Sequence, residues 1–201
     1  MRGDINVIYN IPKDIAFRYI KMHIYKNSVK FAAYKTCLDM YVTKKTIWNA
    51  MTRLSTDGIF VIMCNYHNIS HVLDFLDSEN LSYDVLLFYG DNIKGQDFFQ
   101  TYSSIIPFII IYKSNSYAKI KSSNVIKIKS DNFFLDIFYF FCRFIDPKEI
   151  SLYIGEISNL AVFARRIGHE LIVFDNDLIN INSLLEEGMI ESEVDPWETI
   201  K

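Results

Sequence analysis

The chain has 201 residues, of which 50% are hydrophobic, and its formal net charge is -3 at neutral pH. A chain of this length and apolar content can bury one well-filled core, so we expect a single domain with a covered central sheet. The negative net charge provides no whole-molecule attraction for phosphate backbones. A nucleic-acid contact would therefore have to rest on a local basic patch.

Neither a membrane span nor a metal site is expected. The two strongest apolar runs, 105–112 and 133–145, are too short to cross a bilayer, and residues 1–4 lack the apolar core of a signal peptide. Three cysteines, Cys37, Cys64 and Cys142, are far apart, whereas zinc ligands come in closely spaced pairs. We therefore expect free thiols in an intracellular protein, cytoplasmic or nuclear. Abundant Tyr, Phe, Ile, Asn and Lys are typical of an AT-rich genome, such as that of a virus or mobile element.

The first predicted element is a strand at 5–9, a β-branched and aromatic run. It ends at the turn-prone Asn10-Ile11-Pro12-Lys13, so it delivers a loop at its carboxyl end. Apolar side chains at intervals of three and four residues then predict amphipathic helices at 15–26 and 44–54. The pattern between these two helices does not define a structure.

After residue 57 the chain alternates predicted strands with predicted helices. Strands are expected at 59–64, 83–89, 105–112, 150–154 and 170–174, and helices at 68–78, 132–144 and 158–167. This alternation is typical of a layered α/β fold. We expect the domain to span residues 1–186 and residues 187–201 to form an acidic tail.

Two stretches in the middle of the chain carry a family resemblance. The segments 53–62 (RLSTDGIFVI) and 65–72 (NYHNISHV) are similar to the central part of adenine-N6 and cytosine-N4 DNA methyltransferases. The resemblance implies a three-layer, Rossmann-like methyltransferase fold with a mostly parallel mixed sheet. It also implies that the N-terminal strand lies beside the strand at 150–154, and that one edge strand is reversed. In the permuted order of this family the catalytic loop is N-terminal and the cofactor loop C-terminal.

At the N-terminal place stands Asn10-Ile11-Pro12-Lys13, where the family has [DNS]-P-P-[YFW]. Asn10 and Pro12 keep the polar head and the second proline, but the first proline and the closing aromatic are replaced. In the family, the polar side chain and a backbone carbonyl hold the target amine while the ring stacks on the flipped base. Asn10 could still accept that hydrogen bond, whereas Lys13 cannot stack in the same way. The alternative is that Asn10 is a turn residue that closes a strand.

At the C-terminal place stands 151–159 (SLYIGEISN), where the family has a D-P-F-x-G-S-G-T loop against S-adenosylmethionine. Only Gly155 is retained, and Glu156 and Ile157 add bulk where the backbone must approach a ligand closely. Asp175 falls where an acidic residue binds the cofactor ribose. The alternative is that Asp175 is an ordinary turn acid at a strand end.

Target recognition in this family uses an insertion after the strand at 105–112. Here only residues 113–130 are available, which is too short for a DNA-reading module. Five lysines in this segment could contact phosphates or could belong to a solvated loop. They are Lys113, Lys119, Lys121, Lys127 and Lys129.

The altered motifs favour a catalytically impaired, methyltransferase-like pseudoenzyme without a cofactor. Such a protein would act by binding another protein subunit, such as an active methyltransferase, or a nucleic acid. One alternative is a divergent S-adenosylmethionine-dependent DNA or RNA amino-methyltransferase that uses Asn10 and Asp175. A third hypothesis is an unrelated α/β interaction domain.

Overall fold

The computed structural model describes residues 5–64, 67–90, 105–113, 125–128, 133–142, 145–155 and 158–192. Its strands are β1 (Val7–Asn10), β2 (Val29–Lys35), β3 (Leu54–Met63), β4 (Ser82–Tyr89), β5 (Ile105–Tyr112), β6 (Val125–Lys127), β7 (Ile150–Ile154), β8 (Glu170–Asp175) and β9 (Ile190–Glu191). Its helices are α1 (Ala16–His23), α2 (Met40–Arg53), α3 (Ile69–Ser78), α4 (Phe133–Cys142), α5 (Ser158–Arg166) and α6 (Leu178–Glu186). The predicted alternation of strands and helices is confirmed.

All described strands form one sheet in the order β6-β4-β5-β3-β2-β7-β8-β1-β9. Neighbouring strands are parallel, except that β5 runs antiparallel to β3 and β4. The reversed strand is therefore inside the sheet, and the expectation that it forms an edge is wrong. The expected contact between the N-terminal strand and the strand at 150–154 is also wrong, because β8 lies between β1 and β7 and β2 takes the other side of β7.

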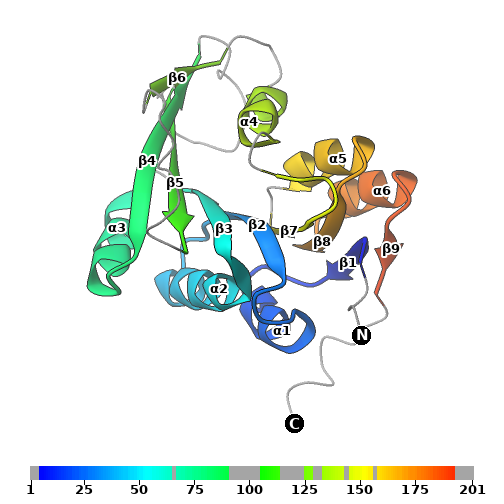
Figure 1. The fold of residues 1–201 in the computed structure, drawn as a ribbon, viewed down its shortest axis with the longest axis horizontal. Helices are drawn as coiled ribbons and strands as arrows, with labels where there is room; N and C mark the ends of the chain where they lie inside the picture. Colours follow the sequence, from blue (N-terminus) through cyan, green and yellow to red (C-terminus); the bar gives the residue numbers. More distant parts are fainter. Residues whose placement is uncertain are drawn as a thin grey trace.

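Helices cover both faces of the sheet (Figure 1). Helices α1, α2 and α3 pack on one face, where Tyr19, Ile47 and Val72 contact the core, and α4, α5 and α6 pack on the other. Along β3, Phe60 and Ile62 face the first layer, whereas Val61 faces the second, as the two-residue period of a strand requires. The predicted three-layer α/β fold with a mostly parallel mixed sheet is confirmed.

A buried cation joins helices α1 and α2 by hydrogen bonds. Arg53, only 5% exposed, donates from Nε to the Ile20 carbonyl at 3.2 Å and from Nη2 to the Lys21 carbonyl at 2.7 Å. These carbonyls lie in the last turn of α1, where a basic side chain can satisfy them. Asp39 begins α2 by accepting hydrogen bonds from the backbone N–H groups of Tyr41 and Val42. The Arg53 bonds thereby join the end of α2 to the end of α1.

Beyond residue 186, where α6 ends, β9 pairs with β1 and continues the sheet. In the described part of the chain, Cys37 and Cys64 are buried free thiols and Cys142 is a half-buried one. No helix among the described residues is long and apolar enough to span a membrane. The described residues also contain no cluster of His, Cys, Asp or Glu that could hold a metal ion.

Candidate cofactor and substrate site

The carboxyl ends of four adjacent parallel strands, β2, β7, β8 and β1, lie at the same edge of the sheet. Asn10 is paired in register with Asp175, and the Gly155 backbone N–H donates to the Phe174 carbonyl at 2.7 Å. The structure thus brings Asn10, Gly155 and Asp175 to one edge. In open α/β sheets this is the edge where ligands bind.

Asn10 is directed toward the outer strand of this edge. Its exposed side chain donates from Nδ2 to Oε1 of Glu191 on β9 at 2.9 Å. Two strand spacings, about 10 Å, separate β1 from β7. Pro12 is exposed in the loop after β1, where its carbonyl accepts a hydrogen bond from the Ile15 N–H at 3.1 Å. Asn10 therefore does not adjoin Gly155 in the way that the resemblance implies.

The N-terminal strand that does adjoin β7 is β2, and sequence reasoning missed it. The resemblance puts the catalytic loop after the N-terminal neighbour of β7, so that place falls to Thr36-Cys37-Leu38-Asp39. Thr36 and Cys37 are buried, at 1% and 8% exposed, and the Cys37 carbonyl accepts a hydrogen bond from Asn68 Nδ2 at 2.6 Å. The available sequence signal was Asp39, a helix-capping residue just before the apolar period of α2.

A buried cluster of neutral groups lies beneath this loop. The Tyr34 hydroxyl is 3.3 Å from Thr43 Oγ1 and donates to Cys37 Sγ at 3.6 Å. Burial raises the pKa of Tyr34 well above its ordinary value, so the phenol stays protonated. These groups tie the loop to α2. The cluster consists of two hydroxyls and one thiol.

Gly155 follows β7 with a φ of +74°, a conformation that favours glycine. The space above it is taken by Lys13. A Cβ atom placed on Gly155 would lie 3.6 Å from Lys13 Cβ and 3.8 Å from Lys13 Cδ. The aliphatic stem of Lys13 therefore lies against Gly155 on the side where a Cβ atom would stand.

The Asp175 carboxylate is turned into its own loop. Its Oδ1 accepts hydrogen bonds from the backbone N–H groups of Asn176 at 2.8 Å and Asp177 at 3.1 Å, and its Oδ2 accepts one from Asn180 Nδ2 at 3.2 Å. The residue is only 2% exposed. Most of the acceptor capacity of an ionised carboxylate is thus used by the turn that leads into α6.

Two of the five predicted phosphate-contacting lysines lie in the described residues. Lys113 follows the antiparallel strand β5 and hence lies at the opposite edge of the sheet from Asp175. Its ammonium donates to Asn27 Oδ1 at 2.7 Å and to the Leu54 carbonyl, and burial lowers its pKa. Lys127 is exposed at the end of β6. Lys119, Lys121 and Lys129 lie outside the described residues.

As arranged, Gly155 and Asp175 do not fit the cofactor role that the resemblance implies. S-adenosylmethionine would need the glycine backbone uncovered and a carboxylate free to bind ribose hydroxyls. Here the glycine is covered by Lys13, and the carboxylate is buried and hydrogen-bonded within its turn. A ligand at this edge would require both to rearrange.

No protein-family profile and no curated protein matches the sequence. Solved structures do match. M1.HpyAVI has 13% sequence identity and a TM-score of 0.68, and the alignment covers 92% of this chain and 100% of that one. TTHA0409 of Thermus thermophilus, assigned as a DNA modification methylase, has 8% identity and a TM-score of 0.69, covering 94% of this chain and 99% of that one. The cytosine-N4-specific PvuII DNA methyltransferase has 11% identity and a TM-score of 0.64, covering 96% of this chain and 92% of that one. This chain therefore has the Rossmann-like fold of DNA methyltransferases.

Proposed function

We propose that this chain is a methyltransferase-fold protein that no longer transfers methyl groups and acts by binding another macromolecule. The observation that carries the proposal is the Asp175 carboxylate, 2% exposed and held by three hydrogen bonds from its own loop. A ribose-binding acid has to offer its oxygens to the ligand. Here they stabilise the turn before α6 instead.

The loop after β2 supports the same proposal. In the family that the chain resembles, a polar side chain and a backbone carbonyl hold the target amine. In this loop, Thr36 stands at the place of the polar side chain and is only 1% exposed, and the Cys37 carbonyl accepts hydrogen bonds from Asn68 Nδ2 and Thr43 Oγ1. Asp39, at the place of the closing aromatic, offers no ring to stack on a base, and its Oδ1 accepts the backbone N–H groups of Tyr41 and Val42. The polar head of this loop is therefore buried, its Cys37 carbonyl is already hydrogen-bonded, and the stacking ring is replaced.

Titration calorimetry with S-adenosylmethionine tests the proposal. We expect no saturable heat at millimolar ligand, either for the natural chain or for Asp175→Ala. Lys13→Ala, which uncovers Gly155, serves as a matched variant. We expect this variant not to bind S-adenosylmethionine either, because the Asp175 carboxylate still holds its own turn. A tritium-transfer assay on unmethylated DNA and RNA should give background counts. Saturable binding that is weakened by Asp175→Ala would instead support a divergent amino-methyltransferase.

A further inference from the structure

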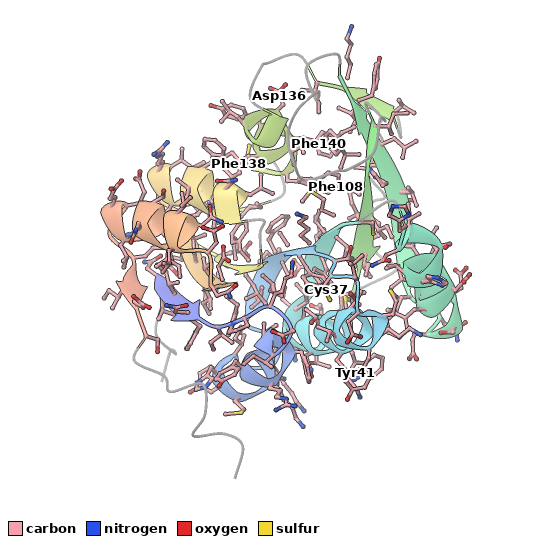
Figure 2. The ribbon with its side chains drawn as sticks, turned by 180° about the vertical axis from the view of Figure 1, so that it is seen from behind. Cys37, Tyr41, Phe108, Asp136, Phe138 and Phe140 are labelled. Carbon is pink, nitrogen blue, oxygen red and sulfur yellow. The ribbon has the colours of Figure 1, made fainter. Side chains whose placement is uncertain are left out.

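The outer surface of α1 and α2 interleaves exposed cations with aromatic rings. The exposed cations are Arg18, Lys21, Lys44 and Lys45, and the exposed rings of α2 are Tyr41 at 63% and Trp48 at 49%. We call this set the α1–α2 surface. It begins at the carboxyl edge of the sheet, because Tyr41 lies in the first turn of α2, and it runs away from that edge along the helix. Figure 2 shows Tyr41 projecting from α2 away from the sheet, while Cys37 lies on its inner side.

Two of these cations contact a pair of rings that links α1 to α2. Arg18 Cζ lies 5.7 Å from the centroid of the Phe17 ring, which meets Tyr41 edge-on at 6.3 Å between centroids. Lys45 Nζ lies 5.6 Å from the Tyr41 ring centroid. In addition, Lys44 Nζ lies 5.6 Å from the centroid of the Phe75 ring on α3. A row of one cation, two rings and a second cation therefore runs from α1 onto α2.

The charge of this surface differs in sign from that of the whole chain. The chain has 24 acidic residues, but neither α1 nor α2 contains one. None of the four exposed cations forms an ion pair within the described part of the chain. The nearby Asp39 carboxylate caps α2. Four exposed cations thus lie on a protein whose net charge is -3, with the exposed carboxylate of Asp14 just before α1.

We propose that the α1–α2 surface binds single-stranded nucleic acid. Unpaired cations attract phosphates, and every unpaired base offers a face that stacks on a ring, so cations and rings together suit a single strand. Tyr41 and Trp48 stand two helical turns apart, about 10 Å along α2, and present two separate stacking positions on one side of the helix. A duplex hides its base faces, and an acidic protein would use the cations but not the rings. This inference rests on the proposed function and names its partner.

Fluorescence anisotropy with labelled oligo(dT) and oligo(U) tests the proposal on the full chain. Tyr41→Ala and Trp48→Ala should each weaken binding about tenfold, since each removes one stacking position. Lys44→Gln combined with Lys45→Gln should reduce the steepness of log affinity against log salt by about 1.4, the effect of two lost phosphate contacts. Tyr139→Ala and Lys148→Gln, exposed residues outside the surface, are the matched controls and should leave binding unchanged.

A direct readout of stacking is available from Trp48. In a Trp197→Phe background it is the sole tryptophan of the chain, and a stacked base should quench its fluorescence. Equal affinity for polyglutamate or for duplex DNA would overturn the proposal, as would a loss of affinity confined to Lys127→Gln. Absence of binding at low salt would overturn it too, but would leave the predicted lack of methyl transfer intact. Binding of S-adenosylmethionine would contradict the proposed lack of methyl transfer but would not contradict nucleic-acid binding by the α1–α2 surface.

Discussion

Replacing Asp175 with alanine tests whether this carboxylate stabilises the fold or is available to a ligand. The side chain accepts three hydrogen bonds, at 2.8, 3.1 and 3.2 Å, and is 2% exposed. Hydrogen bonds to a charged group contribute about 1.5–3 kcal/mol each, and bonds that share one acceptor are less than additive. We therefore expect Asp175→Ala to lower the free energy of unfolding by about 3 kcal/mol. For a chain of this size the midpoint temperature should fall by about 9 °C.

Thermal and urea denaturation followed by circular dichroism measures this change. Asn180→Ala is the matched control, because it removes the bond to Oδ2 alone, and it should cost about 1 kcal/mol. Asp177→Ala removes the N-cap of α6, with two backbone N–H partners, and should also cost about 1 kcal/mol. If Asp175→Ala destabilises the chain no more than Asn180→Ala does, the carboxylate is not holding the turn and the reasoning is refuted.

Three further predictions concern stability and thiol chemistry. Lys113→Met removes the bonds to Asn27 and Leu54 and should lower the free energy of unfolding by about 1 kcal/mol in urea, without changing oligonucleotide affinity. Burial lowers the pKa of His169 below its ordinary 6.5, with a smaller opposing effect of Asp146, so the unfolded chain binds a proton that the folded chain does not. The free energy of unfolding should therefore fall as the pH drops below 6.5 toward the folded-state pKa. In urea denaturation between about pH 7.5 and 5, His169→Phe should make the free energy of unfolding depend less on pH. An unchanged dependence on pH in this variant would contradict the prediction. Burial raises the pKa of Cys64 to about 12, so alkylation of the folded protein should reach the half-buried Cys142 first and Cys64 only on unfolding, as peptide mass spectrometry would reveal.

Most of the fold could be predicted because its strands are continuous apolar runs. The run at 59–64 is buried on both faces, which is what a central strand under two helix layers requires. The amphipathic periods of α1 and α2 likewise predicted these helices. Their ends differ from the predicted ones by up to four residues, because caps such as Asp39 and not the apolar period set where a helix begins.

Strand β2 could not be predicted although it lies in the middle of the sheet. Its centre is Ala32-Ala33, and alanine has a low preference for strands. In the fold, Ala32 faces one helix layer and Ala33 the other, both fully buried, so burial outweighs intrinsic preference. Strands β6 and β9, of three and two residues, exist through pairing with β4 and β1 and have no periodicity of their own.

Because β2 was not predicted from the sequence, the candidate site could be predicted only in part. The order of strands and helices along the chain correctly predicted that Asn10, Gly155 and Asp175 lie at one edge of the sheet, because the carboxyl ends of parallel strands share an edge. It could not reveal that β2 is the neighbour of β7, since sheet order depends on long-range packing. The loop Thr36-Cys37-Leu38-Asp39 therefore appeared only in the structure.

A crystal structure determined with a large excess of S-adenosylmethionine tests the central claim most directly. We predict that Lys13 stays against Gly155, that Asp175 keeps its bonds to Asn176, Asp177 and Asn180, and that the carboxyl edge holds no cofactor. A sulfonium ligand seated on Gly155, with Lys13 displaced and the Asp175 carboxylate on the ribose, would contradict the account.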